Sequence, residues 1–259
     1  MYKINREKHY LSFDIDNNII NLFLFKPFNF NFDLVSQDEI DRQYNEIEKM
    51  LDYRFKKIVK GHQVHSSNIA IIDENNVNDN FLNTDGLLTN LDGVALITKV
   101  ADCQSILLYD SNLGVIGNVH SGWKGTVKKI VGNAIKLMID HYGCNTKDIK
   151  VYICPSISGE SFEVDEDVKD MFVDSFSNLD ISKYIVNKGV KYYIDTIGIN
   201  REYLISLGLL DENIFNTDLC TLKNSDFLHS YRKDKDKSGR NLALICKKRW
   251  LTSLFILSK

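Results

Sequence analysis

Residues 113–143, LGVIGNVHSGWKGTVKKIVGNAIKLMIDHYG, hold the strongest structural pattern in the sequence. The first part, 113–120, is an apolar run of strand length, which favours a buried β-strand. Between 125 and 142 apolar side chains recur every three or four residues, and Gly143 can end the helix that this spacing predicts. The apolar positions of this helix are Val127, Ile130, Val131, Ala134, Ile135 and Met138. A buried strand packed on an amphipathic helix is therefore the first element of the fold.

Strands and helices alternate irregularly on either side of this stretch. Two further helices are predicted at 37–52, capped by Ser36 or Asp38, and at 164–176, and residues 192–209 lead from a strand into a helix. Strand-like runs occur within 9–30, 57–65, 93–103, 105–110, 150–157 and 241–250. The apolar end, 250–259, is predicted as a last helix or strand. This irregular order favours a mixed α+β fold over a doubly wound sheet.

Composition and charge exclude several classes of protein. Hydrophobic residues make up 44% and the formal net charge is −3, so nothing calls for a nucleic acid or an anionic membrane as partner. No linker or repeat divides the chain, and we expect residues 1–259 to form a single domain that is a monomer or a small homo-oligomer. The N-terminus does not resemble a signal peptide, and no apolar run is long enough to cross a membrane, so we expect a cytoplasmic protein.

The five cysteines should then be reduced. Their odd number and wide spacing do not fit a disulfide framework. Four of them are predicted to be small buried hydrophobic residues, namely Cys144, Cys154, Cys220 and Cys246. Cys103 is considered separately below.

Three short segments place reactive side chains at the ends of predicted strands, where clefts commonly form. They are HQVHSS at 62–67, KVADCQS at 99–105 and NVHSGWKGT at 118–126. Two imidazoles and a thiolate, from His65, His120 and Cys103, suit zinc, and three protein ligands leave one position open for catalysis. His62 is an alternative to His65, but three residues along an extended segment it would point to the opposite face.

The unremarkable interpretation of each residue also stands. A single histidine is more often a surface or core residue than a ligand, and a cysteine after a strand is usually a packed hydrophobic residue. The spacings are not those of a zinc finger or of H-E-x-x-H. His9, His141 and His229 lie among polar residues and are predicted to face water.

Eight motifs occur in one order along the chain: QVHSS, TDGLLT, ADC, VHSGWKGT, CPSISGESFEV, INREYLISLG, CT and SYRKDKDKSGRN. In this order the sequence resembles the laccase-domain family, whose members have been called polyphenol oxidases and purine nucleoside phosphorylases with adenosine deaminase activity. The resemblance runs from about Gly61 to Ile245. It implies a four-layer α-β-β-α sandwich with mixed sheets, and a zinc site made by His65, Cys103 and His120.

The resemblance also implies a function and its substrates. The expected enzyme is a zinc-dependent purine nucleoside phosphorylase acting on adenosine, inosine and guanosine, with methylthioadenosine as a further candidate, and able to deaminate adenosine. Departures from the family pattern are Gln43-Tyr44 where an Asn-Arg pair is common on the first helix, Ser105 in place of proline, and Lys124 in place of arginine. Lysine keeps the charge but loses the planar donor geometry of arginine.

Further site residues follow from the needs of this chemistry. Cys103 and His120 are assigned catalytic as well as ligand roles. An anionic phosphate needs cations, for which Lys124 and Arg232 are the candidates, aided by the N-terminus of the helix that begins near Thr126. Candidate substrate-binding residues are Gln63, Ser121 and Arg240.

The neighbours of these residues each have two alternative roles. Asp102 is expected either to orient a ligand histidine or to cap a turn. Trp123 could stack on the purine or be structural, and Glu163 could belong to a helix cap.

Other functions remain open from the sequence. A copper-dependent polyphenol oxidase would need more histidines than the six present. A cysteine hydrolase could use Cys103 with His120. A non-enzymatic structural metal protein would normally need a fourth protein ligand.

Overall fold

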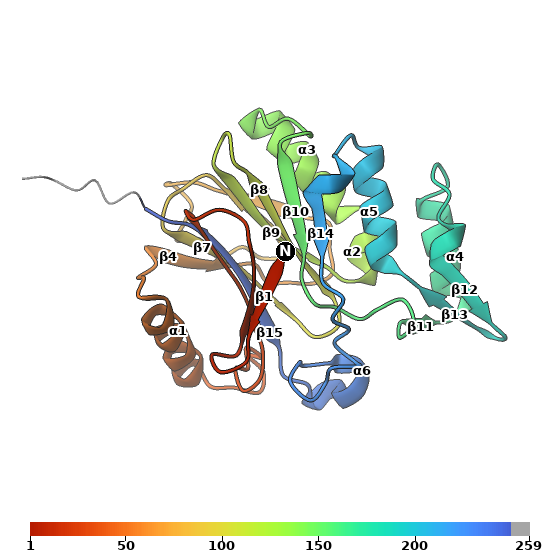
Figure 1. The fold of residues 1–259 in the computed structure, drawn as a ribbon, viewed down its shortest axis with the longest axis horizontal. Helices are drawn as coiled ribbons and strands as arrows, with labels where there is room; N and C mark the ends of the chain where they lie inside the picture. Colours follow the sequence, from red (N-terminus) through yellow and green to blue (C-terminus); the bar gives the residue numbers. More distant parts are fainter. Residues whose placement is uncertain (250–259) are drawn as a thin grey trace, which may run out of the picture.

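The computed structural model describes residues 1–249, and it has two six-stranded sheets packed face to face with helices on the outer sides (Figure 1). Helix α1 (Gln37–Leu51) covers the first sheet. Helix α3 (Ile130–Tyr142) covers the second, with α5 (Thr196–Ser206) packed beside it. The layers therefore run α, β, β, α, which confirms the fold predicted by the family resemblance.

The first sheet has the strand order β1-β2-β3-β15-β7-β4, and its pairs are antiparallel except β4 with β7. Its strands are β1 (Tyr2–Asn5), β2 (Tyr10–Phe13), β3 (Ile19–Leu24), β4 (Lys57–Lys60), β7 (Val94–Val100) and β15 (Asn241–Lys247). The C-terminal strand β15 thus lies between strands from the first hundred residues, as Figure 1 shows.

The second sheet has the order β14-β10-β8-β9-β6-β5 and mixes parallel and antiparallel pairs. Its strands are β5 (Ile69–Ile72), β6 (Gly86–Thr89), β8 (Gln104–Asp110), β9 (Val115–Ser121), β10 (Ile149–Ile153) and β14 (Ile214–Asn216). Both central strands, β8 and β9, are buried along their whole length.

Alternation along each strand divides the core between the layers, because successive side chains of a strand point to opposite faces. In β15, Ala243 and Ile245 pack in the cluster between the sheets, whereas Leu242 and Leu244 pack in the cluster that contains α1. Polar side chains also join the sheets: Asn118 on β9 donates to two backbone carbonyls of the first sheet, each at 3.0 Å. These two hydrogen bonds show that Asn118 faces the first sheet. His120, two residues further along β9, lies on the same face.

The helix predicted for 125–142 is interrupted. A short helix α2 (Trp123–Val127) ends at Lys128, and α3 begins after Lys129, whose φ of 58° is left-handed. The expected long helix N-terminus near Thr126 is therefore absent, and α2 has only five residues. By contrast α1 matches its prediction, with Ser36 as the cap that accepts from the backbone of Glu39.

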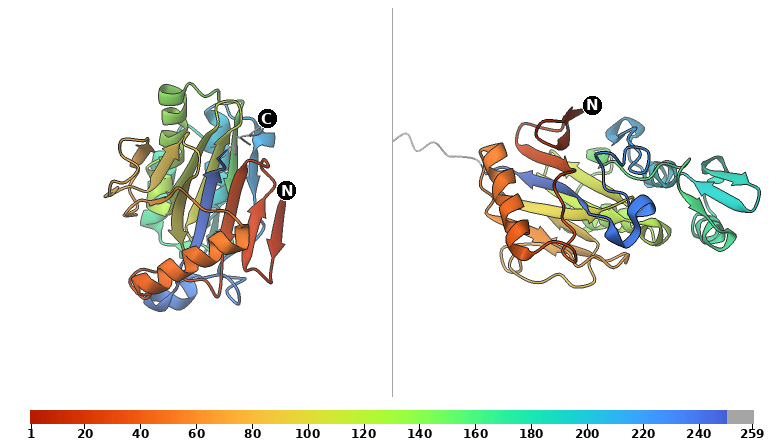
Figure 2. Two further views of the ribbon diagram at one scale, coloured as in Figure 1. Left: turned by 90° about the vertical axis from the view of Figure 1, so that its left-hand side faces the viewer. Right: turned by 90° about the horizontal axis from the view of Figure 1, so that it is seen from below.

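A small third sheet projects to one side of the large sheets together with α4 (Glu166–Ser175), as Figures 1 and 2 show. Its strands are β11 (Glu163–Val164), β12 (Ile185–Lys188) and β13 (Lys191–Ile194), and short 3₁₀ turns lie at Ser182–Tyr184, Asp211–Asn213 and Lys235–Lys237. The four-residue helix α6 (Tyr231–Asp234) lies at the base of the molecule in Figure 1.

Burial tests several remaining sequence predictions. The cysteines Cys144, Cys154, Cys220 and Cys246 are buried and all five cysteines are free, as predicted. Among the helices that the structure describes, none combines the length and apolarity needed to cross a membrane. The predicted last element at 250–259 lies outside the described residues.

Candidate metal centre and its cavities

The three predicted ligands come together although they are far apart in the chain. His65 lies in the loop after β4, Cys103 in the turn between β7 and β8, and His120 near the end of β9. Their ligand atoms all lie within 4.8 Å of one another. His120 is buried, Cys103 is half-buried and His65 is exposed, so the cluster opens to one side.

Distances within the cluster suit coordination of a single ion. The Cys103 Sγ lies 3.9 Å from the His65 Nε2, and the two imidazole rings stand 4.9 Å apart at 70°. His120 Nδ1 is engaged by Asp85 at 2.8 Å, which leaves its Nε2 for the cluster. Two imidazoles and one thiolate are ligands that zinc and related metals favour.

Asp85 holds two of the ligands in place, and the sequence did not identify it as a site residue. Its carboxylate is buried and accepts from His120 Nδ1, from the backbone N–H groups of Val64, His65 and Ser66, and from the Ser66 hydroxyl. A carboxylate on the second nitrogen of a ligand histidine fixes its tautomer and orientation. The only signal in the sequence was its place in TDGLLT, one of the eight motifs of the family resemblance.

The backbone at the cluster is adapted to close approach. A Cβ on Gly122 would lie 2.6 Å from His65 Cδ2 and 3.0 Å from Cys103 Sγ. His65 and Asp102 both have left-handed backbone angles, with φ of 60° and 84°. Residues other than glycine rarely adopt such angles, and they concentrate at sites where surrounding contacts impose them.

Electrostatics favours a charged cluster when no metal is bound. Burial alone would raise the pKa of the Cys103 thiol, but hydrogen bonds with His120 and His65 lower it to about 6. Burial alone would lower the pKa of His120, but hydrogen bonds with Asp85 and Cys103 raise it to about 9. The pKa of Asp85 is held well below its usual value because hydrogen bonds from His120 and Ser66 outweigh its burial. A thiolate is therefore already present at neutral pH to bind a metal.

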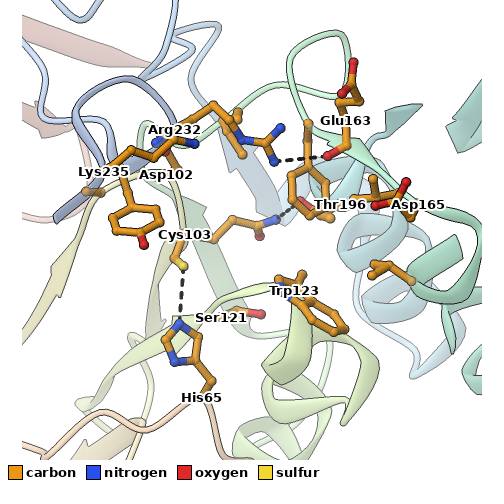
Figure 3. Close-up of a pocket in the computed structure, with 17 residues that line it drawn as sticks. His65, Asp102, Cys103, Ser121, Trp123, Glu163, Asp165, Thr196, Arg232 and Lys235 are labelled. Atoms are coloured by element: carbon orange, nitrogen blue, oxygen red, sulfur yellow. Dashed lines mark hydrogen bonds between the residues drawn. The ribbon is translucent and has the colours of Figure 1, made fainter. Parts of the chain in front are cut away.

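A first cavity of about 480 Å³ opens beside the cluster (Figure 3). Its walls combine aromatic and apolar side chains with a few polar groups, the usual make-up of a small-molecule site. The lining includes His65, Cys103, Ser121, Trp123, Phe162, Thr196 and Arg232. Sequence reasoning did not identify Phe162, Thr196 or Tyr231 at this site, although Phe162 and Tyr231 lie within the family motifs CPSISGESFEV and SYRKDKDKSGRN.

A second cavity of about 590 Å³ lies on another side of the same cluster. His65, Ala101, Cys103 and Tyr231 line both cavities, so two of the three metal ligands form part of the wall that the two share. His120, His62, Gln63, Lys99 and Arg240 line only the second. The cluster can therefore be reached from two directions.

Asp102, next to Cys103, does not orient a ligand histidine. One carboxylate oxygen accepts from the Thr221 hydroxyl at 2.6 Å and the other from the backbone N–H of Arg232 at 2.5 Å. It therefore ties the Cys103 turn to α6, in agreement with the capping alternative. Arg232 in turn donates from its guanidinium to the Glu163 carbonyl at 3.1 Å, a bond drawn in Figure 3.

The remaining predicted site residues differ in position. Gln63 exchanges two hydrogen bonds of 2.9 Å with the backbone of Lys99, which fixes the loop that carries His65. Lys124 is exposed, with its ammonium 5.5 Å from the ring of Trp123, and it lines neither cavity.

One prediction about a histidine was wrong. His229 does not face water: it is buried and its Nε2 lies 2.8 Å from the Phe28 carbonyl. The stretch 227–230 that contains it is buried, although the charged residues on either side, Asp226 and Lys233, are exposed.

Residues 24–248 match the family described as multi-copper polyphenol oxidoreductase laccase. The chain belongs to this laccase-domain family. The family description names copper, whereas similar proteins carry another activity in their names.

Among similar laccase-domain proteins, the purine nucleoside phosphorylase YlmD of Bacillus subtilis is 36% identical over 162 residues, covering 62% of this chain and 58% of that protein. The chain thus matches less than two thirds of that relative's length. A purine nucleoside phosphorylase of Borreliella burgdorferi is 32% identical over 241 residues, covering 92% of this chain and 97% of that protein.

Solved structures of the same laccase-domain shape confirm the fold. The YfiH protein of Bacillus licheniformis superposes with a TM-score of 0.85 at 23% identity, covering 93% of this chain and 97% of that one. YlmD of Geobacillus stearothermophilus gives a TM-score of 0.83 at 21% identity, covering 95% of this chain and 98% of that one.

Proposed function

We propose that this laccase-domain chain is a zinc-dependent purine nucleoside phosphorylase that also deaminates adenosine. The observation that carries the proposal is a three-ligand cluster, open on one side, in the wall of a cavity with aromatic surfaces. The names of the relatives point to the same substrate class. We propose adenosine, inosine and guanosine as substrates, with methylthioadenosine as a further test compound, in a cytoplasmic enzyme.

The donor set supports zinc as the metal. His65, Cys103 and His120 supply nitrogen and sulfur, and within residues 1–249 no fourth histidine, cysteine or carboxylate joins the cluster. Zinc held there supplies a Lewis acid with one coordination position left for a reactant. Since zinc binds neutral imidazole, loading must displace the proton that keeps His120 charged in the metal-free protein.

The reactions proposed for the site balance as follows. In phosphorolysis the C1′–N9 bond of the nucleoside breaks and a C1′–O bond to phosphate forms, while the proton of hydrogen phosphate ends on the departing purine. The transition state resembles an oxocarbenium ion, by analogy with glycoside hydrolysis. In deamination, water replaces the amino group at C6 of adenosine, which gives inosine and ammonia.

Residues of the chain have distinct roles in this proposal. The indole of Trp123 and the ring of Phe162 offer flat apolar surfaces to the purine in the first cavity. Ser121 and Arg232 line the same cavity and are proposed to contact the nucleoside. Lys124 is left out of the site because its side chain is exposed and lines neither cavity.

A copper-dependent polyphenol oxidase is the alternative that the family description suggests. The six histidines are too few for it: beyond the two ligands, His229 bonds to a carbonyl, His9 and His141 meet aromatic rings edge-on, and His62 alone lines a cavity beside the cluster. A trinuclear copper centre with a blue-copper site needs many more imidazole ligands than remain.

A cysteine hydrolase is the second alternative, and one observation favours it. Cys103, His120 and Asp85 lie in the order thiol, imidazole and carboxylate that such enzymes use. His65 distinguishes the hydrolase from the zinc enzyme. A hydrolase needs only His120 beside the Cys103 thiolate, whereas a zinc site needs His65 as a further ligand.

The test combines metal analysis with activity assays. We expect the purified protein to contain one zinc per chain, to release purine from inosine only with phosphate, and to release ammonia from adenosine without phosphate. His65→Ala and Cys103→Ala should both abolish zinc binding and nucleoside cleavage. Zinc-free protein together with a fully active Cys103→Ala variant would refute the proposal. Esterase activity that survives in His65→Ala and is lost in Cys103→Ala would favour the hydrolase.

A further inference from the structure

The second cavity is lined by positively charged side chains to which the proposed function assigns no reactant. Lys99 and Arg240 both line it, along with the ligands His65, Cys103 and His120. Lys60, on the neighbouring strand β4, places its ammonium 3.8 Å from the ring centre of Phe32, and Lys99 places its own 4.1 Å from the same ring. Two ammonium groups thus converge on one aromatic side chain at the rim of this cavity.

These cations are incompletely neutralised by the protein. Within residues 1–249, Lys60, Lys99 and Arg240 form no ion pair with a carboxylate inside 4.0 Å. Burial and the nearby Lys60 lower the pKa of Lys99 to about 8, with Arg240 adding to the effect and Asp33 opposing it. Asp33 also lines the cavity, but it is exposed, so it offsets only part of the charge. An anion placed between these groups would relieve their repulsion.

The backbone of Lys99 and the guanidinium of Arg240 are held by hydrogen bonds before any ligand arrives. Gln63 holds the backbone of Lys99 through two hydrogen bonds, each of 2.9 Å. Arg240 donates from Nη1 to the carbonyls of Ser238 and Gly239 at 2.8 and 3.0 Å. A guanidinium has five N–H donors, so others remain for a phosphate oxygen. A preorganised site of this kind loses little entropy when it binds.

The first cavity differs in its charge. Its guanidinium, Arg232, donates to the Glu163 carbonyl and lies 5.7 Å from the ring centre of Phe162. Its lining has mixed charge, because Glu163 and Asp165 line it together with Arg232 and Lys235. Aromatic surfaces with opposing charges suit a neutral nucleoside better than an anion.

We propose that the second cavity binds inorganic phosphate through Lys99 and Arg240, so that phosphate and nucleoside reach the metal centre from opposite sides of the wall formed by His65, Cys103 and Tyr231. This inference rests on the proposed phosphorylase function and assigns its second substrate to a place. It moves the phosphate role from Lys124 and Arg232, where the sequence put it, to residues on β7 and just before β15. Phosphorolysis then requires that C1′ of the nucleoside lie at the edge of this wall, beside the metal ligands, with the purine in the first cavity.

The kinetic test uses Lys99→Met, which keeps the aliphatic stem and removes the charge. Loss of a charged hydrogen bond should raise the KM for phosphate about tenfold to a hundredfold, with the KM for inosine changed less than about twofold. Lys57→Met is the matched control, since Lys57 lies on β4 and bonds to Asn78 away from both cavities. It should leave both constants unchanged. A phosphate KM for Lys99→Met within twofold of the unmodified protein, or equal rises in both constants, would overturn the inference.

A binding experiment separates this inference from the proposed function. Inorganic phosphate is titrated calorimetrically into the zinc-loaded protein without nucleoside, and the melting temperature of each variant shows whether it is folded. Binding that is lost in Lys99→Met and kept in Lys57→Met supports the anion site even if no phosphorolysis occurs, in which case only the proposed function fails. Unchanged phosphate binding by folded Lys99→Met refutes the site, whatever the activity of the enzyme.

Discussion

Two carboxylates lie next to the metal ligands and do different work. Asp85 accepts hydrogen bonds from His120 and from the backbone of His65, so it holds two ligands directly. Asp102 accepts its hydrogen bonds from Thr221 and from the start of α6, so it ties the Cys103 turn to these segments and not to a ligand side chain. The difference teaches that closeness to a ligand in the sequence is a poor guide to support in space, since Asp102 neighbours Cys103 and Asp85 neighbours none of the three.

Asp85→Asn should have the largest effect on the metal. The asparagine amide keeps one acceptor oxygen, but its NH₂ group faces N–H groups that now donate to Asp85. The substitution also removes the negative charge that orients His120. We expect zinc affinity to fall about a hundredfold, with nucleoside cleavage falling alongside. Competition with a zinc-binding dye measures the affinity. Affinity within threefold of the unmodified protein would mean that Asp85 does not hold the ligands.

Gly122→Ala should come next, because it acts on the ligands by contact instead of charge. The new methyl would lie 2.6 Å from His65 Cδ2, so the ligands must separate. We expect about a tenfold loss of zinc affinity. Gly125→Ala is the matched control, since its methyl meets nothing closer than 3.4 Å. Equal zinc affinities for the two alanine variants would contradict the close fit at Gly122.

Asp102→Asn should affect the substrate more than the metal. It weakens the hold on the backbone of Arg232, so the first cavity loosens while the three ligands keep their partners. We expect the KM for inosine to rise about threefold, with zinc affinity unchanged, from loss of one charged hydrogen bond shared with a second partner. A loss of zinc as large as that in Asp85→Asn would erase the distinction between the two carboxylates.

The smallest effect should appear in the titration of Cys103 in zinc-free protein. Alkylation by iodoacetamide should be half-maximal near pH 6, because the pKa of the thiol is about 6 beside His120 and His65. As pH falls through this value the thiolate is protonated and the rate declines. In Asp85→Asn, His120 loses the partner that keeps it charged, so the midpoint should move to higher pH, whereas in Asp102→Asn it should not. Mass spectrometry of the Cys103 peptide measures the rate.

Local sequence patterns predicted some elements well and others badly. Apolar spacing predicts helix α1 and strand β9 because α1 packs one side against a core and β9 is buried along its whole length. The helix predicted at 125–142 breaks at Lys129, whose left-handed backbone has no signature in a lysine. His229 seemed exposed from its polar neighbours, yet the fold buries it against Phe28. The single-domain assignment over residues 1–259 stays a prediction.

The sequence by itself determined a mixed α+β fold through local periodicity, and its resemblance to the laccase-domain family supplied the order of the layers and the three metal ligands. The tertiary structure alone decided that Asp85 supports the three predicted ligands and that two cavities of different charge share His65 and Cys103 in their walls. The physical reason is that these contacts join segments up to about a hundred and seventy residues apart, from the loop after β4 to Arg240 before β15. Only the packing of the two sheets fixes which of those distant side chains come within bonding distance.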